Sequence, residues 1–533
     1  MFNKQFVGKT AGIVLAALTL LTLVAIPIQH QQIPSLIALG VIFVATAVMA
    51  YKNPINGLLI AFAEIMVGGH GHLIDASVGG FSLSIRMVIF AAVMLAWLAS
   101  SIRTKTWPKF MVLRDTPWLL LLLAVGIGAI IGLAQNNVGE AFDDANSYVT
   151  IAYLLPLLSI AWDSNKKREL LQVLFASTIF ICVNTLLIVF LFTHLPGGLL
   201  RGVYEFVRDA RIAEVTLLTG PKWFVGNLLP SASPWYFRVF EPAHFFPMVM
   251  IFALVAARFT VWKSERMPLI AKATLILCTA TFIASLSRSF VLGAMAGAGI
   301  VALFALLDAP KSVGKYVLNA GRVGLVMALG AVLFWAVIVS PIPKHPNLKE
   351  AAFYKASQAD DRGLAISSRW NLLYPMYQEI VASPMLGRGF GHDVTFITDD
   401  PRIRATNPTG EYTTYRFEWG YQDIWLKMGL LGLIAFVWYF VVVSRAFYFT
   451  YHNHGHRWLT IGLYAGVVAL FITHVFSPYL NHPIGLGYML FVLPFFDWEG
   501  LTLALRKQEG EKEMVRLPFK LQSSTSLSRE KLQ

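Results

Sequence analysis

Cysteine and charge are both scarce in this chain of 533 residues. The only two cysteines, Cys182 and Cys278, fall inside apolar runs, which excludes a disulfide framework or a thiolate metal site, so we expect both to pack in the interior. Charged residues make up 14% of the chain, against roughly 25% in an ordinary soluble domain, whereas 56% of the residues are hydrophobic. This imbalance is typical of a protein that crosses a membrane many times.

Long apolar runs separated by short polar loops extend over most of the chain. A helix needs about 20 apolar residues to cross the hydrocarbon core of a bilayer, so the sequence predicts about fourteen transmembrane helices. The runs at 55–68, 148–162 and 483–500 are the shortest of these. We therefore predict an all-α, polytopic integral membrane protein, and no internal repeat is visible in it.

Lysine and arginine are missing from the short loops that would lie on one side of the membrane, which are residues 30–32, 68–80, 135–147 and 477–483. They are frequent in the alternate segments, at 101–115, 163–170, 257–267, 308–322 and 506–516. By the positive-inside rule the second set faces the cytoplasm, which predicts that both termini are cytoplasmic. The net charge of +13 reflects this distribution and does not indicate nucleic-acid binding.

Two connections on the outer side are much longer than the others, at 195–241 and 341–423. Loops of this length are usually functional or disordered, and their arginines, carboxylates and aromatic residues favour function. Arginine suits the bidentate binding of phosphate, although each one taken alone is well explained as a solvated side chain. The loops divide the chain into transmembrane helices at 1–194, 242–340 and 424–502, followed by a disordered cytoplasmic tail at 503–533.

Both long loops are expected to contain amphipathic helices, and the clearest lies in the second loop. Ser367 or Ser368 would cap its N-terminus, and Pro375 would kink it or begin it. One face would carry Trp370, Leu373, Tyr374 and Tyr377. Such a helix would lie on the membrane surface, cover a cavity, or pack against other loop residues.

Polar residues interrupt several apolar runs near their predicted outer ends. Arg288 is the only charge in 273–307, and the topology places it at an outer turn, where it could meet a ligand or extend to the interface. Glu64 and Arg86 lie toward the outer ends of their spans, and we expect a structural ion pair between them. Glu241 and His244 stand at the outer mouth of a span, where we expect them to pair or to take part in chemistry.

Three motifs follow one another in the second half of the chain. They are "SLSRSFVLG" at 285–293, "SSRWNLLYPMYQEIVASPMLGRGFG" at 367–391 and "WLKMGLLGLIAF" at 425–436. In order, spacing and side of the membrane they resemble the O-antigen ligase and polymerase superfamily, and "RVFEPAHFF" at 238–246 resembles an element of its polymerase branches. The similarity covers about residues 240–433. One departure is that many members, ligases especially, have a His-Asn pair where this chain has Glu418 and Trp419.

The resemblance implies a GT-C-like, all-helical membrane glycosyltransferase of the bacterial inner membrane. Members of the superfamily transfer a glycan from undecaprenyl pyrophosphate to a sugar hydroxyl on the periplasmic face, bind the pyrophosphate through arginines and need no metal. Polymerases use another lipid-linked repeat unit as the acceptor, and ligases use lipid A core. Arg288 and Arg369 match arginines of the family, and Gly387 and Gly389 match its glycine turn.

The hypothesis from the sequence is a polymerase of exopolysaccharide, capsule or O-antigen that uses neither a metal nor a cofactor. Glu418 is the first candidate for the base and Glu241 the second, while Arg288 would stabilise the pyrophosphate leaving group. The candidate substrate-binding residues are Arg238, His244, Arg362, Arg369, Trp370 and Arg388. The expected partners are a lipid-linked oligosaccharide donor, a glycan acceptor and membrane lipids, with a chain-length regulator as a further candidate and no nucleic acid.

Two alternatives are also compatible with the sequence. A ligase would transfer the glycan to lipid A core, although the change to Glu418 and Trp419 weighs against it. A transporter or flippase of lipid-linked oligosaccharide would have a similar number of spans, but transporters place functional charges near the middle of the membrane and often contain repeats. Here the charges cluster at the outer face, which favours an enzyme.

Overall fold

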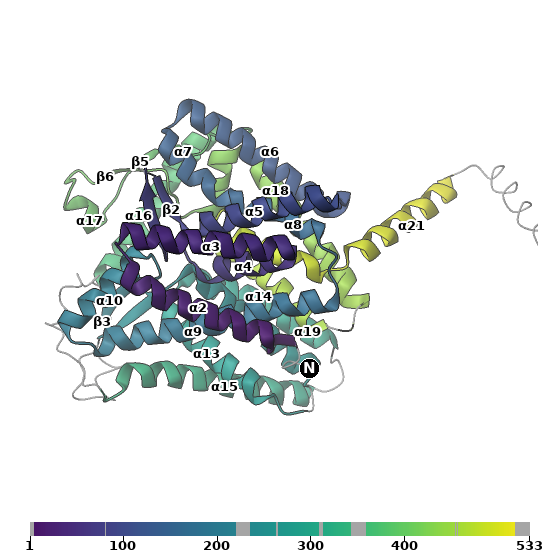
Figure 1. Cartoon of the computed structure of the whole chain (residues 1–533), viewed down its shortest axis with the longest axis horizontal. Helices are drawn as coiled ribbons and strands as arrows, with labels where there is room; N and C mark the ends of the chain where they lie inside the picture. The colour runs from purple at the N-terminus through teal and green to yellow at the C-terminus, as the bar shows by residue number, and fades with distance from the viewer. Residues whose placement is uncertain are drawn as a thin grey trace, which may run out of the picture.

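The computed structural model describes residues 5–79, 81–219, 235–262, 265–308, 313–342, 359–453, 455 and 457–516. Within these ranges the chain forms an elongated bundle whose long helices run side by side (Figure 1). The long helices are α2 (Lys9–Ile28), α3 (Gln32–Lys52), α5 (Ile85–Thr104), α6 (Val112–Gln135), α9 (Ser164–His194), α12 (Phe245–Thr260), α14 (Arg288–Asp308), α15 (Val313–Val339) and α18 (Gly420–Asn453). Three apolar helices are shorter: α4 (Pro54–Val67), α13 (Leu269–Ser285) and α19 (Arg457–Thr473).

The number of possible membrane spans differs from the predicted fourteen. In the part of the chain that the structure describes, nine helices are long and apolar enough to cross a membrane, or ten if a bent pair is one span. That pair joins α20 (Pro483–Phe491) and η3 (Leu493–Phe495) to α21 (Trp498–Arg516) with a bend of 67°. The predicted span at 148–162 is instead a buried 3-10 helix, η1 (Asn146–Tyr153), followed by the short α8 (Leu154–Ser159). The prediction of many membrane-spanning helices is nevertheless confirmed.

The centre of the bundle is α12, which is almost entirely buried, whereas most residues of α2, α3 and α15 remain exposed on the outside. Small residues allow the central helices to approach closely. Gly462 of α19 lies against the backbone of Ala253 in α12, so a side chain there would overlap it. Cys182 and Cys278 are both buried, and their sulfur atoms lie 3.9 Å apart across α9 and α13, in agreement with their predicted packing role.

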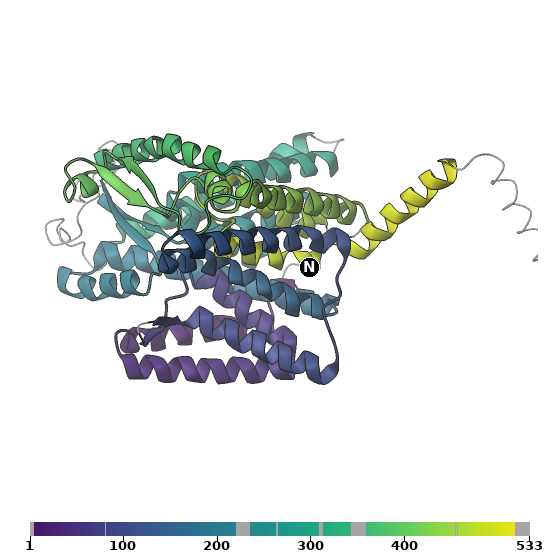
Figure 2. The same ribbon diagram turned by 90° about the horizontal axis from the view of Figure 1, so that it is seen from above.

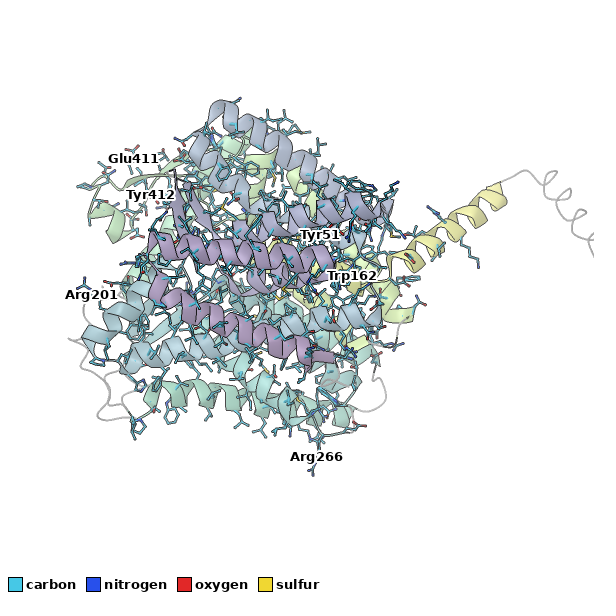
Figure 3. All side chains as sticks on the ribbon, in the orientation of Figure 1. Tyr51, Trp162, Arg201, Arg266, Glu411 and Tyr412 are labelled. Atoms are coloured by element: carbon cyan, nitrogen blue, oxygen red, sulfur yellow. The ribbon has the colours of Figure 1, made fainter. Side chains whose placement is uncertain are left out.

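Both long loops lie at the same end of the bundle. Figure 3 places Arg201, Glu411 and Tyr412 of these loops at one end, and Tyr51, Trp162 and Arg266 toward the other. Near the first end, the predicted ion pair between Glu64 and Arg86 is confirmed, with Arg86 Nε 2.9 Å from a Glu64 oxygen. This end is hereafter the outer end, following the charge distribution of the sequence.

The outer end contains β-hairpins that the all-α prediction did not include. Each is an antiparallel pair: β1 (Asp75–Val78) with β2 (Phe81–Ser84), β3 (Glu214–Thr219) with β4 (Trp235–Phe240), and β5 (Val394–Ile397) with β6 (Glu411–Thr414). Their β-branched and aromatic residues fit a pleated, half-buried surface, and this short-range preference was hidden among the longer helical patterns.

Helices also cover the outer end, as α7 (Val138–Ala145), α10 (Gly197–Asp209), α16 (Ala359–Ala382) and α17 (Pro401–Arg404). Helix α16 begins before the predicted cap at Ser367 or Ser368 and continues through Pro375. At the opposite end, α21 continues to Arg516 and projects from the bundle, so helix replaces the first part of the predicted disordered tail (Figures 1 and 2). Residues 517–533 of that tail lie outside the described part.

Candidate active site at the outer end

A cavity of about 640 Å³ opens at the outer end between segments that are far apart in the chain. Its lining comes from the α4–β1 loop, the β3–β4 hairpin, the α13–α14 turn, α16, the residues before α18 and the α19–α20 loop. Five residues predicted from the sequence line it together: Arg238, Arg288, Arg369, Trp370 and Glu418. We call the side formed by β4 and the α13–α14 turn the turn wall, and the side formed by residues 369, 370, 418 and 419 the helix wall.

The turn wall is built around Arg288, the first residue of α14. The chain reverses between α13 and α14 through Leu286, whose φ of 42° is a left-handed conformation that costs a leucine roughly 1–2 kcal/mol. This turn leaves the Arg288 side chain exposed in the cavity, and no carboxylate of the described residues forms an ion pair with it. Strain of this kind is common where a fold must present a functional group.

Serine hydroxyls continue the turn wall beside Arg288. The Ser287 and Ser289 hydroxyl oxygens lie 3.1 Å apart, and Ser477 donates to Ser289 at 2.9 Å. All three residues line the cavity. The hydroxyl groups can rotate to donate to an acceptor that enters, so this wall offers neutral donors next to a cation.

Arg238 joins the turn wall from strand β4. Its Nε donates to the Ser285 carbonyl oxygen at 2.8 Å, and its guanidinium lies 4.9 Å from the centre of the Phe240 ring. The hairpin is thereby attached to the α13–α14 turn, so Arg238 and Arg288 face the same space.

The helix wall has a different chemistry. Arg369 of α16 forms an ion pair with Glu418, and the Trp419 indole Nε1 donates to the Arg369 carbonyl oxygen at 2.8 Å. Burial, followed by the charge of Arg288, lowers the pKa of Arg369. Trp370 lies edge-to-face with Trp419, with 5.0 Å between ring centres.

Four helical segments begin at this cavity. Pro242 opens the 3-10 helix η2 (Pro242–His244) that leads into α12, Arg288 opens α14, and Trp419 and His482 immediately precede α18 and α20. All four residues line the cavity. Because the N-terminus of a helix carries about half a positive charge, this arrangement favours an anion.

Several lining residues were not predicted from the sequence. His70 and His482 meet edge-to-face with 5.7 Å between ring centres, and Glu214 adds a second carboxylate to the cavity. Desolvation in the cavity, followed by the charge of Arg86, lowers the pKa of His70 to about 4, so the ring is neutral at pH 7. The two histidines belong to short outer loops without lysine or arginine, and this shared location was the only signal that could have paired them.

Glu241 and His244 are placed behind the cavity rather than in it. Both are buried, and both contact the Thr185 hydroxyl, at 3.2 Å and 2.8 Å. Burial raises the pKa of Glu241 to about 8. The carboxyl group therefore holds its proton at pH 7, and it also caps η2 together with His244.

Arg388 is not among the described residues that line the cavity. Arg388 belongs to the turn at 387–391, and its Nε lies 3.0 Å from an oxygen of Glu379 in α16. In this turn Gly389 has a φ of 81° and lies against the backbone of Gly132, so only glycine fits there. The Arg362 side chain lies outside the described part of the chain.

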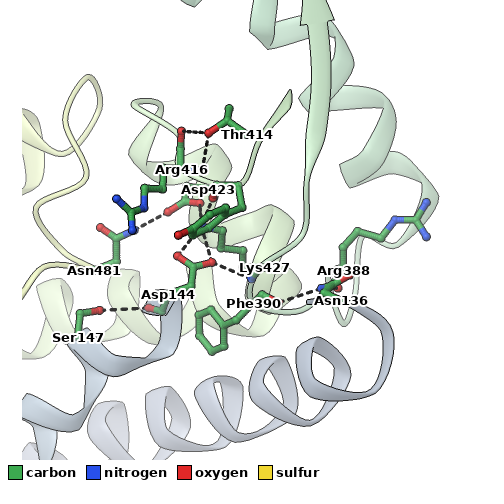
Figure 4. Close-up of polar contacts among 12 residues, drawn as sticks. Asn136, Asp144, Ser147, Arg388, Phe390, Thr414, Arg416, Asp423, Lys427 and Asn481 are labelled. Atoms are coloured by element: carbon green, nitrogen blue, oxygen red, sulfur yellow. Dashed lines mark hydrogen bonds and ion pairs between the residues drawn. The ribbon is translucent and has the colours of Figure 1, made fainter. Parts of the chain in front are cut away.

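A buried ionic cluster fixes the segments that carry the helix wall (Figure 4). Lys427 Nζ lies 2.6 Å from Asp423 and 2.7 Å from Asp144, and it donates to the Tyr415 carbonyl oxygen at 2.9 Å. Asn481 of the α19–α20 loop donates to Asp423. The segment before Glu418 and the loop before His482 are thus held by one set of charges.

The comparisons with known proteins address the same part of the chain. No curated protein matches it. Residues 273–437 match the family described as O-Antigen ligase. That range begins within α13, includes Arg288, Arg369, Trp370 and Glu418, and ends within α18. The match supports a function of the O-antigen ligase or polymerase type, in agreement with the resemblance noted in the sequence.

Proposed function

We propose that the protein is a membrane glycosyltransferase that polymerises lipid-linked oligosaccharide repeat units into a surface polysaccharide. The donor would be a glycan on undecaprenyl pyrophosphate, and the acceptor would be a sugar hydroxyl of a second lipid-linked unit. The cavity would face the periplasm, in an inner-membrane protein with cytoplasmic termini. The convergence of three arginines and four helix starts on one cavity is the observation that carries this proposal.

The arginines would hold the pyrophosphate and stabilise its departure. Arg288 and Arg238 would bind it from the turn wall, and Arg369 would complete the site from the helix wall. When the bond between the anomeric carbon and the pyrophosphate oxygen breaks, the electron pair leaves with that oxygen. Preorganised cations and helix starts stabilise this charge as it develops, without a metal in the proposed mechanism. Arg362, whose side chain lies outside the described part of the chain, remains a further candidate for contacts with the donor.

Glu418 would act as the base that activates the acceptor. Its carboxylate would take the proton of the acceptor hydroxyl while the hydroxyl oxygen attacks the anomeric carbon. The ion pair with Arg369 orients Glu418 in the cavity. Glu241 is the weaker candidate, because it is buried beside Thr185 and holds its own proton at pH 7.

Chain growth by the purified protein tests this proposal. Full-length protein in detergent is incubated with lipid-linked repeat units, and the products are separated by size. We expect a ladder of longer glycans that remain on the lipid. Because transport has no meaning in detergent, a ladder also excludes a flippase as the sole function. Unchanged substrate after incubation with folded protein contradicts the proposal.

Ligation is the second candidate function, because the matching family is described as O-Antigen ligase. A ligase would move the glycan to lipid A core without lengthening it. The same incubation with added lipid A core distinguishes the two: transfer to the core at constant glycan length indicates a ligase. A partner that sets chain length would change the ladder's distribution without being needed for its formation.

A further inference from the structure

Helix α16 presents two apolar faces, of which one is buried and the other is largely exposed. Leu372, Met376 and Ile380 are buried against the strands and helices beneath them. Trp370 and Tyr377, on the other face, are 57% and 60% exposed. A ligand that covers this exposed aromatic face would be stabilised by burying it. The side chains around the face therefore indicate which kind of ligand binds there.

Trp370 is the aromatic residue of that face that lines the cavity. Trp419 covers at most one face of the Trp370 indole, because the two rings meet edge-to-face at 65° with 5.0 Å between centres. Trp419 is itself fixed by its bond to the Arg369 carbonyl and by packing against Phe476, with 5.5 Å between ring centres. Trp370 thus presents an open, rigidly supported aromatic surface to the cavity.

Polar groups beside Trp370 are arranged to bind hydroxyl groups. The Glu418 carboxylate and the Arg369 guanidinium lie in the same wall and are both about half exposed. A pyranose ring has one apolar face of C–H groups and a rim of hydroxyls. An aromatic surface suits that face, and a carboxylate such as Glu418 suits the rim.

The turn wall is suited to a different part of the substrate. The turn wall offers Arg288, Arg238 and serine hydroxyls, which favour an anion over a neutral ring. Two chemically distinct walls in one cavity imply two distinct substrate parts, which would meet where the reaction takes place.

We infer that Trp370 forms the floor of an acceptor subsite, where a pyranose ring of the glycan acceptor stacks on the exposed indole and places its hydroxyl at Glu418. This inference rests on the proposed function, because it assigns the acceptor half of the same cavity. Its ligand class is a neutral or weakly charged oligosaccharide rather than the lipid pyrophosphate.

Binding of a lipid-free oligosaccharide tests the inference without requiring turnover. The probe is oligosaccharide released by partial acid hydrolysis of the polysaccharide from the producing cells, titrated calorimetrically into the full-length protein in detergent. Loss of one aromatic contact should weaken binding by roughly three- to tenfold in Trp370→Ala, while Trp370→Phe retains most of the affinity. Tyr377→Ala is the matched control, since Tyr377 is equally exposed on the same helix, and it should bind as the wild type does.

A second titration shows whether Trp370→Ala is folded and which ligand it has lost. Polyprenyl pyrophosphate without a glycan should bind Trp370→Ala with unchanged affinity. Unchanged oligosaccharide binding by Trp370→Ala, or an equal loss in Tyr377→Ala, overturns the inference. Weaker binding of the glycan-free lipid alone would mean that Trp370 contacts the isoprenoid, which also overturns it. If the protein does not extend glycans but its oligosaccharide binding still depends on Trp370, the result counts against the proposed function only.

Discussion

The two walls of the cavity use arginine in different ways. On the turn wall, Arg288 is exposed at a strained turn, and no described carboxylate pairs with it. On the helix wall, the charge of Arg369 is matched by Glu418, and its backbone is fixed by Trp419. An unmatched cation is available to an anionic ligand, whereas a matched one orients its carboxylate. The turn wall is therefore suited to binding charge, and the helix wall is suited to positioning a reacting group.

The largest effect is expected on the helix wall, from Glu418→Gln. This change keeps the shape of the side chain and removes the group proposed to accept the acceptor's proton. We expect kcat to fall on the order of 10³-fold, within the range for loss of a general base. Chain growth by purified protein measures it, and donor binding should change little. A variant with wild-type kcat would show that the helix wall does not supply the base.

Arg288→Lys tests the turn wall. Lysine retains the charge and loses the fork that binds two phosphate oxygens, so kcat/KM for the donor should fall on the order of 10²-fold. The affinity for polyprenyl pyrophosphate should fall as well, whereas oligosaccharide binding should be retained. Equal losses for both ligands would mean that the walls do not divide the substrate as proposed.

Trp419→Phe tests how the helix wall is held. Phenylalanine retains an aromatic ring next to Trp370 and removes the bond from the indole Nε1 to Arg369. Loss of one such bond costs about 1 kcal/mol, so kcat should fall roughly fivefold with donor affinity unchanged. Steady-state kinetics with purified protein measure both. An unchanged kcat would show that this bond does not position Glu418.

Glu241→Gln should have the smallest effect on activity at pH 7, because glutamine resembles the protonated carboxyl that burial maintains. The pKa of Glu241 rises from an ordinary 4.5 to about 8 in the fold. Its contribution to stability is therefore complete below about pH 4.5 and is lost as the pH rises through 8. Thermal unfolding in detergent between pH 6 and pH 9 should show a fall for the wild type that the variant lacks. A large loss of activity at pH 7 would restore Glu241 as a candidate base.

The sequence predicted the membrane class and much of the cavity because those signals are local. Arg288 stands out as one charge in an apolar run, and Arg369, Trp370 and Glu418 lie in or beside motifs with a recognisable order. His70 and Glu214 join them only through long-range packing, which leaves no trace in the neighbouring residues. The hairpins were missed because their strands are short. The sequence placed Glu241 at the outer mouth of a span but did not predict its contact with Thr185 of α9.

The division of the cavity into two walls is tested most directly by the affinity of glycan-free polyprenyl pyrophosphate for three proteins in detergent. We expect about tenfold or greater weakening in Arg288→Lys, and wild-type affinity in Trp370→Ala. Wild-type affinity in Arg288→Lys, or a comparable loss in Trp370→Ala, would contradict this division.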